Sequence, residues 1–368
     1  MNIPFIDLKS QYKELQPVIQ ERINRVLDHG QYIMGPEVQE LEDKLAAYTN
    51  SKYCITTGSG TDSLLISLMA LGISTGDEII TTPFTFISTA EVIVLLGAKP
   101  IFVDIDPETC NINASLIEKK ITKKTKAIVP VSLYGQPSDM DMINEIAKRN
   151  GDIPVIEDAA QSFGATYKTN KSCNLSTVGC TSFFPSKILG CYGDGGAIFT
   201  NNAKIANACK EIREHGQTER FVHPRIGIGG RMDTIQCAIV LAKLESFDWV
   251  VKKRIEIGNH YNLSIDKINI KRVIQRKDRS SVFGQYSIFI ENRKDFQNQL
   301  IKNGVPTAVY YPTPINEQIA YKNFCCPECT PVAKTISKKV ISIPMSPELK
   351  TEHQELVINL IKEYSNNE

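Results

Sequence analysis

Short apolar runs alternate with amphipathic stretches along the first two thirds of the chain. The apolar runs predict buried strands at residues 52–57, 78–82, 100–104 and 127–131. Stretches with helical spacing of apolar positions lie between or after them, at residues 35–47, 61–71, 88–96 and 139–149. This repeated alternation of strand and helix predicts an α/β fold, with a mostly parallel sheet covered by helices.

The pattern changes after residue 245. A helix over 233–244 is followed by a basic helix, short strands and hairpins over 271–292, and two further helices. The 368 residues are too many for one small core. We therefore predict a large domain over residues 1–245, including an N-terminal arm, and a smaller α+β domain over residues 246–368.

Composition and charge narrow the class of protein. The chain is 42% hydrophobic and 23% charged, with a formal net charge of +1, which is ordinary for a globular enzyme. A balanced charge gives no general attraction to nucleic acid or membranes. The start of the chain lacks the pattern of a secretory signal, and no apolar run has the length of a membrane span. We expect a cytoplasmic protein with neither nucleic acid nor membrane as a partner.

Cysteine usage fits a reducing compartment. Most of the ten cysteines lie singly in apolar segments, as reduced core cysteines do. The exception is the run Cys325-Cys326-Pro327-Glu328-Cys329, whose spacing could suit a metal or a redox pair. No second such pair lies nearby and His353 is distant, so we expect no metal site and interpret the run as a surface loop with accessible thiols.

Two segments carry the candidate chemistry. Asp158 ends an apolar run, so it is predicted at the carboxyl edge of the sheet, where open α/β sheets bind ligands. Lys187 follows 29 positions later, among Phe183, Phe184 and other apolar residues. Each residue alone has a plainer explanation, as an acidic helix cap or a surface lysine. Together they are the acid for a pyridine nitrogen and the amine for an imine that pyridoxal 5'-phosphate requires.

A phosphate site is the next requirement. Gly58-Ser59-Gly60-Thr61 lies between a predicted strand and a predicted helix, where backbone N–H groups suit a phosphate, although a plain helix cap is an equal alternative. Ser182 could supply a hydroxyl to the same phosphate. Phe86 could stack on the cofactor ring, although a lone aromatic is more often a core residue.

These residues, taken with motifs along nearly the whole chain, resemble the DegT/DnrJ/EryC1/StrS family of sugar-nucleotide aminotransferases. Matching runs include Phe5–Leu8, Gly30–Pro36, Glu157–Gln161 and the segment that ends at Gly196. The resemblance implies the aspartate-aminotransferase architecture of fold type I. It also implies a homodimer whose active sites lie at the subunit interface.

The resemblance implies roles residue by residue. Lys187 matches the Schiff-base lysine and Asp158 the partner of the pyridine nitrogen. The other implied cofactor contacts are Gln161 with the ring hydroxyl, Gly60, Thr61 and Ser182 with the phosphate, and Phe86 with the ring face. Arg231 would reach the neighbouring subunit's site and meet an acidic substrate, and Tyr310 and Tyr311 would contact the sugar.

Within the family, the run from Ser172 to Tyr192 is most similar to enzymes that aminate C3 of UDP-2-acetamido-2-deoxy-3-oxo-glucuronate. Glutamate would be the amino donor, and the product would feed a bacterial surface polysaccharide such as the O-antigen of lipopolysaccharide. Three positions depart from the family pattern, and one of them, Ile188 in place of asparagine or proline after Lys187, is expected to have little effect. Gly229 replaces an asparagine that reaches the cofactor phosphate across the dimer interface, and Tyr310 replaces the histidine of a His-Tyr-Pro motif.

Other functions stay open at this point. The chain could aminate a different keto carbon or a different nucleotide sugar. It could also be a catalytically silent relative that binds nucleotide sugars, an alternative supported by Gly229 and opposed by Lys187 and Asp158. Cofactor-dependent dehydration is known in relatives with histidine in place of the lysine, and Lys187 argues against it.

Overall fold

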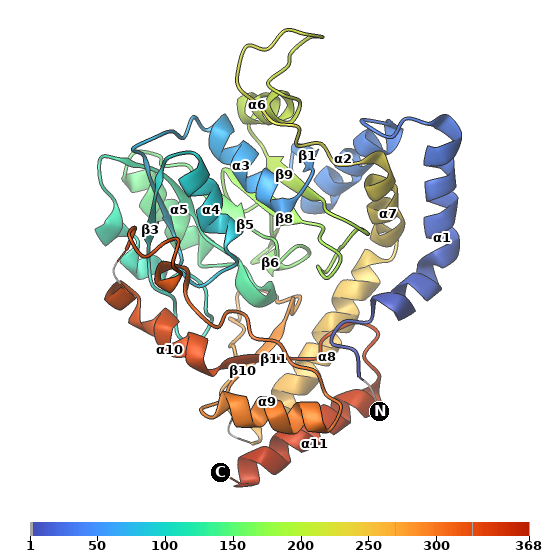
Figure 1. Ribbon diagram of the computed structural model, residues 1–368, viewed down its shortest axis with the longest axis vertical. Coiled ribbons are helices and arrows are strands. Elements are labelled where there is room, and N and C mark those ends of the chain that lie inside the picture. The colour runs from blue at the N-terminus through green and yellow to red at the C-terminus, as the bar shows by residue number, and fades with distance from the viewer. Residues whose placement is uncertain (1–2, 269, 326, 368) are drawn as a thin grey trace.

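The computed structural model describes residues 3–268, 270–325 and 327–367. Helices and strands alternate in the N-terminal part, and the C-terminal part lies below it in Figure 1. The strands are β1 (Tyr53–Thr57), β2 (Glu78–Thr81), β3 (Lys99–Phe102), β4 (Thr125–Val129), β5 (Ile156–Asp158), β6 (Thr166–Tyr167), β7 (Asn170–Lys171), β8 (Val178–Ser182), β9 (Gly196–Thr200), β10 (Tyr286–Phe289) and β11 (Val340–Ile343). The helices are α1 (Leu8–His29), α2 (Pro36–Thr49), α3 (Gly60–Ala70), α4 (Ser88–Leu95), α5 (Met140–Arg149), α6 (Ala203–Arg213), α7 (Thr234–Leu244), α8 (Phe247–Asp266), α9 (Arg293–Lys302), α10 (Pro331–Lys339) and α11 (Thr351–Asn367).

The large sheet is mostly parallel, as predicted. Strands β3, β2 and β4 form one ladder, and β5, β8, β9 and β1 form another. Parallel bridges from Ile128 to Val155 and from Val131 to Asp158 join the two ladders. Strand β9 runs antiparallel to both of its neighbours, while every other pair in these ladders is parallel. The α/β class is confirmed.

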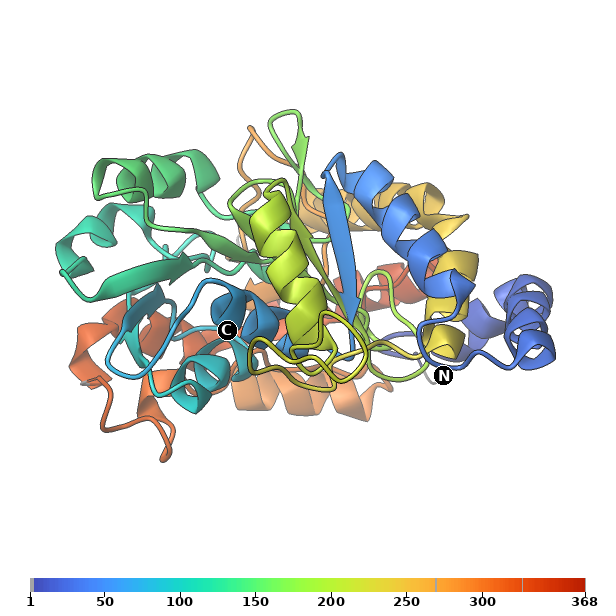
Figure 2. The ribbon, with the colours of Figure 1, turned by 90° about the horizontal axis from the view of Figure 1, so that it is seen from above.

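Apolar cores lie on both faces of this sheet, because successive strand residues point to opposite sides. Ile198 packs with α3 and α6 on one face. The next residue, Phe199, packs with α2 and α7 on the other face. Helix α6 crosses one side of the sheet in the view from above (Figure 2), and α1 lies against α7 at the edge of the molecule. Both faces being buried explains the continuous apolar runs in the sequence.

Helix α8 leads from the large sheet to the C-terminal part (Figure 1). Its first turn contributes Phe247 to the core beside α2 and α7. Further along, Tyr261 packs in a separate core with β10, β11 and α11, and Ile3 of the N-terminal arm joins that second core. The division into domains at residue 245 stays a prediction.

The strands of the C-terminal part differ from those predicted. Residues 271–292 contain a single strand, β10, which pairs antiparallel with β11 from much later in the chain. Residues 271–273 lie beside β10 but make only an isolated bridge, between Arg272 and Ile288. The local hairpin was therefore the wrong pairing, because the partner that covers β10 is distant in sequence.

The cysteines follow the predicted pattern only in part. Those predicted as reduced core residues are buried and free: Cys54, Cys110, Cys180, Cys191, Cys209 and Cys237. In the later run, Cys325 is half-buried, and Cys329 is disulfide-bonded, so an accessible thiol is the wrong description of Cys329. Cys326 lies outside the described residues. Within the described ranges, no group of three or more His, Cys, Asp or Glu residues could hold a metal ion.

None of the helices in the described part of the chain is both long and apolar enough to cross a membrane.

Candidate active site

The predicted site residues meet at one edge of the sheet. Strands β1, β2, β5 and β8 run in the same direction, so their carboxyl ends lie along the same edge. Asp158 is the last residue of β5 and Ser182 the last of β8. Lys187 follows β8, Gly60 follows β1 and Phe86 follows β2. Ligands bind at this edge in open α/β sheets.

Asp158 is buried and hydrogen-bonded. Its side chain is 5% exposed. Its Oδ2 accepts a hydrogen bond of 2.8 Å from the Thr89 hydroxyl of α4, and its Oδ1 accepts one of 3.2 Å from the Ala160 backbone N–H. Burial raises the pKa of this carboxyl, while the two hydrogen bonds and the charge of Lys187 act in the opposite direction. A cation at this position would stabilise the ionised carboxylate.

Lys187 has the environment of a reactive amine. It is only partly exposed, and Phe183, Ile188 and Leu189 beside it in the chain are buried. Desolvation lowers the pKa of the Lys187 amine, and the charge of Asp158 opposes that shift. A lysine with a lowered pKa has more of the neutral amine that can attack a carbonyl carbon.

The turn between β1 and α3 forms a close-fitting cradle. Ser59 caps α3, since its hydroxyl accepts a hydrogen bond of 3.0 Å from the Asp62 N–H. The first N–H groups of a helix have no acceptor within the helix, and Gly60 and Thr61 occupy those positions. A Cβ on Gly60 would lie 2.7 Å from Ser182 Cβ, so only glycine allows this approach. The turn and the Ser182 hydroxyl therefore face each other as an anion site would require.

Gln161 belongs to a hydrogen-bonded group beside Asp158. It is 6% exposed. Its Oε1 accepts a hydrogen bond of 2.9 Å from the Tyr134 N–H, and its Nε2 donates one of 3.2 Å to the Tyr311 hydroxyl. Burial, followed by the charge of Asp158, raises the pKa of Tyr311. Tyr310 stands next to it, with its ring 6.5 Å from that of Phe5.

Two predicted residues lie at the margin of this group. Phe86 is 56% exposed, so the interpretation as a core aromatic is wrong and its ring is accessible. Arg231 is partly exposed in a segment that passes the β1–α3 turn, where the Gly58 N–H donates a hydrogen bond of 2.8 Å to the Gly230 carbonyl. The predicted contact of Arg231 with a neighbouring subunit stays a prediction.

Sequence reasoning missed two members of the site. Thr89 lies one helical turn after Phe86 and is 1% exposed, so a polar residue on a buried helix face was the available signal. Tyr134 adopts a left-handed backbone conformation with φ of 56°, which the sequence does not indicate because glycine and asparagine are the usual residues there.

The residues present fit pyridoxal phosphate. The buried carboxylate needs a cation such as a protonated pyridine nitrogen. The Lys187 amine can hold a carbonyl carbon, and the turn at Gly60 with Ser182 can hold a phosphate. All three come from the same edge of one sheet.

Comparison with known proteins gives the same cofactor and class. The family model described as DegT/DnrJ/EryC1/StrS aminotransferase matches residues 13–362. The chain belongs to the DegT/DnrJ/EryC1/StrS aminotransferase family. It is 52% identical over 349 residues to UDP-2-acetamido-2-deoxy-3-oxo-D-glucuronate aminotransferase of Pseudomonas aeruginosa, covering 95% of this chain and 96% of that protein.

Solved structures agree with this membership. The aminotransferase of this family from Brucella abortus has a TM-score of 0.96 and 37% identity, over 99% of this chain and 100% of that one. The ntda protein of Bacillus subtilis, solved with bound cofactor PMP, has a TM-score of 0.92 and 29% identity, over 99% of this chain and 85% of that one. The protein is therefore an aminotransferase that uses pyridoxal 5'-phosphate.

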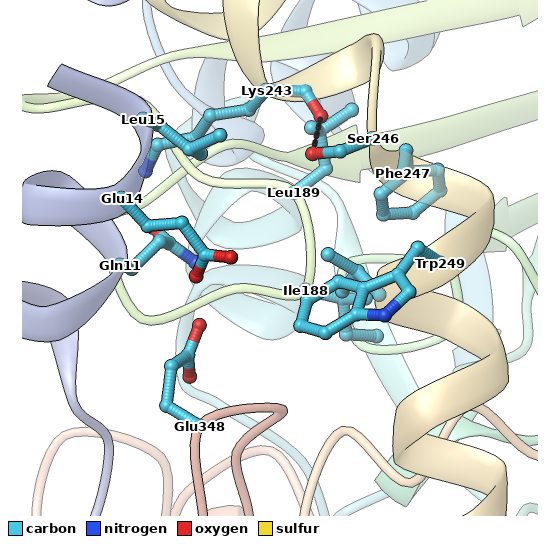
Figure 3. Close-up of a pocket in the computed structure, with 11 residues that line it drawn as sticks. Gln11, Glu14, Leu15, Ile188, Leu189, Lys243, Ser246, Phe247, Trp249 and Glu348 are labelled. Carbon is cyan, nitrogen blue, oxygen red and sulfur yellow. Dashed lines mark hydrogen bonds between the residues drawn. The ribbon is translucent and has the colours of Figure 1, made fainter.

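A separate cavity of this aminotransferase lies beside Ile188 and Leu189, which follow Lys187 in the chain (Figure 3). It has a volume of about 260 Å³ and is lined by Gln11, Glu14, Leu15, Ile188, Leu189, Lys243, Ser246, Phe247, Trp249, Val250 and Glu348. Neither Lys187 nor Asp158 lines it. Lys243 is 5% exposed, and its amine lies 4.2 Å from the centre of the Tyr192 ring. Desolvation lowers the pKa of Lys243 to about 8. A buried lysine with a lowered pKa therefore also lies outside the site.

Proposed function

We propose that the protein transfers the amino group of L-glutamate to C3 of UDP-2-acetamido-2-deoxy-3-oxo-glucuronate. The observation that carries this proposal is the placement of Lys187 and Asp158 at one sheet edge, in a chain 52% identical to an enzyme named for that keto sugar. Pyridoxal phosphate supplies the electron-accepting ring that makes transamination possible.

The chain's own residues would divide the work. Asp158 keeps the pyridine nitrogen protonated by its charge. Lys187 would hold the cofactor between turnovers, and its free amine would move the proton from glutamate Cα to the cofactor carbon that carries the amino nitrogen. Gly60, Thr61 and Ser182 would bind the phosphate, Gln161 would contact the ring hydroxyl, and Phe86 would cover the ring face.

Substrate recognition would need a second copy of the chain. In this proposal Arg231 of one protomer pairs with the substrate carboxylate in its partner's site, while Tyr310 and Tyr311 contact the sugar. Supporting this, Arg231 keeps a partly exposed side chain beside the β1–α3 turn. A homodimer with shared active sites is thus part of the proposal. The enzyme would act in the cytoplasm, without nucleic acid or membrane partners, and its product would enter lipopolysaccharide O-antigen.

The test is a reaction of purified protein with pyridoxal phosphate, glutamate and the keto sugar nucleotide, followed by mass spectrometry beside the Lys187→Ala variant. Amine formed by wild type alone supports both chemistry and substrate. If glutamate converts the bound cofactor but no amino sugar forms, the sugar is wrong. If neither step occurs although cofactor is bound, the protein is a silent nucleotide-sugar binder.

A further inference from the structure

Tyr134 lies in a constrained turn. Its hydrogen bonds reach both Gln161 and the Tyr310–Tyr311 segment of the proposed substrate site. It is 2% exposed and has φ of 56° and ψ of 8°. A non-glycine residue held in this region is unfavourable and persists only where its surroundings enforce it. The next residue, Gly135, has φ of 110°, and a Cβ there would lie 2.5 Å from the Phe283 nitrogen. The turn is therefore pressed against the segment that follows Val282 and cannot relax in that direction.

That conformation aims the Tyr134 N–H at Gln161. The bond to Gln161 Oε1 is 2.9 Å long. If the amide were reversed, its NH₂ group would face the Tyr134 N–H, donor against donor. The Gln161 Nε2 must therefore point the other way, where it donates to the Tyr311 hydroxyl. One N–H of that NH₂ group remains for a further acceptor.

The hydroxyl of the same tyrosine reaches the other segment. It donates a hydrogen bond to the backbone carbonyl of Tyr310. Tyr311 then accepts from Gln161, and its own hydroxyl hydrogen stays available for donation. Since burial raises the pKa of Tyr311, this phenol remains protonated at neutral pH.

We infer that Tyr134 is a positioning residue, which sets the amide orientation of Gln161 and the location of the Tyr310–Tyr311 pair. This inference rests on the proposed function, because it needs Gln161 at the cofactor ring and the tyrosine pair at the sugar. It assigns no contact with substrate to Tyr134 itself. Its expected signature is a change in sugar binding without a change in the glutamate reaction.

The test compares Tyr134→Phe with Tyr261→Phe. Tyr261 is a matched control, since it is also buried and its hydroxyl also donates to a backbone carbonyl, that of Pro344, at 3.1 Å. We expect Tyr134→Phe to raise KM for the keto sugar about fivefold. The glutamate half-reaction, followed by the absorbance of the bound cofactor at a pH far from its titration midpoint, should be unchanged. In the double variant with Tyr311→Phe, the two effects should not add, because both act through one group.

A second readout separates this inference from the proposed function. The pH midpoint of the bound cofactor's visible absorbance should move in Gln161→Leu. It should move in the same direction, less far, in Tyr134→Phe, which keeps the backbone N–H but releases the Tyr310–Tyr311 pair that holds the other side of the Gln161 amide. This readout requires no sugar turnover, so it holds even if the substrate assignment fails. Equal KM values for Tyr134→Phe and Tyr261→Phe, or a midpoint that moves in Gln161→Leu alone, would overturn the inference. An unmoved midpoint in Gln161→Leu would overturn it as well.

Discussion

The Thr89 hydroxyl donates a hydrogen bond of 2.8 Å to Asp158 Oδ2, and both side chains are buried. Thr89 lies in the first turn of α4, so this bond joins the helix after β2 to the end of β5. The bond favours the ionised carboxylate, against the effect of burial on its pKa. Thr89 thus helps to keep the charge that a pyridine nitrogen requires.

Replacing Thr89 by valine should weaken cofactor binding. Valine keeps the shape of the side chain but leaves Asp158 Oδ2 without its donor, and a hydrogen bond to a charged group contributes about 1.5–3 kcal/mol. We expect the dissociation constant for pyridoxal phosphate to rise about tenfold. Absorbance titration of the cofactor-free protein measures it.

Thr85→Val is the matched control for that experiment. The Thr85 hydroxyl lies 3.4 Å from the Thr89 hydroxyl and is also buried, but it does not contact Asp158. The affinity of the Thr85→Val variant for pyridoxal phosphate should stay within about twofold of wild type. Equal losses in the two variants would show that the buried hydroxyls matter only for packing.

Lys187→Ala should lose transamination by at least about a thousandfold, because Lys187 is the amine whose charge acts on Asp158 and the one placed to attach the cofactor and move the proton. The visible absorbance of the attached cofactor should disappear, as measured in spectra before and after glutamate. Lys243→Met tests whether burial alone makes a lysine reactive. Lys243 is buried with a lowered pKa but lies against Tyr192, so this variant should keep both absorbance and turnover.

The sequence indicated the candidate catalytic residues better than the residues that hydrogen-bond to the site and position it. Asp158 could be placed because it ends an apolar run whose carboxyl end defines a sheet edge, and Lys187 was indicated by its apolar neighbours in the chain. Thr89 and Tyr134 could not, since their roles depend on which helix packs over β5 and on a left-handed turn stabilised by distant residues. The pairing of β10 with β11 was not predicted, for a similar reason: a sequence pattern favours nearby partners, and β11 lies far along the chain from β10.

Asp158→Asn should change the pH dependence of stability in the cofactor-free protein. The folded pKa of Asp158 is raised above the unfolded value, so the folded state binds more protons between these two values. The stability from this carboxyl is fully present below about pH 3.9 and is lost as pH rises through the folded pKa. The asparagine variant should therefore unfold at a higher temperature than wild type near neutral pH, by a few degrees, while the difference disappears in acid.

Thermal unfolding of both proteins across this range measures the effect. Glu157 is also buried with a raised pKa, and part of that shift comes from the charge of Asp158. The difference between the two curves therefore reports Asp158 together with its effect on Glu157. With pyridoxal phosphate present the order should reverse, because the pyridine nitrogen then pairs with the carboxylate of wild type. A variant less stable at every pH in the absence of cofactor would contradict the assigned direction.

Gly229→Asn should tighten cofactor binding. The resemblance to the family implies that an asparagine here reaches the phosphate across a dimer interface. A Cβ at Gly229 would meet only the His215 ring, with Cε1 at 3.1 Å and Nε2 at 3.2 Å, and that ring is the end of a side chain that can rotate. One added hydrogen bond contributes roughly 1 kcal/mol, so we expect the dissociation constant for pyridoxal phosphate to fall about fivefold.

Gly229→Ala carries the same backbone change without the amide and should bind the cofactor no better than wild type. If alanine and asparagine give the same affinity, the amide does not reach the phosphate, and the glycine has another reason to be there, such as the bridge between residues 214 and 229.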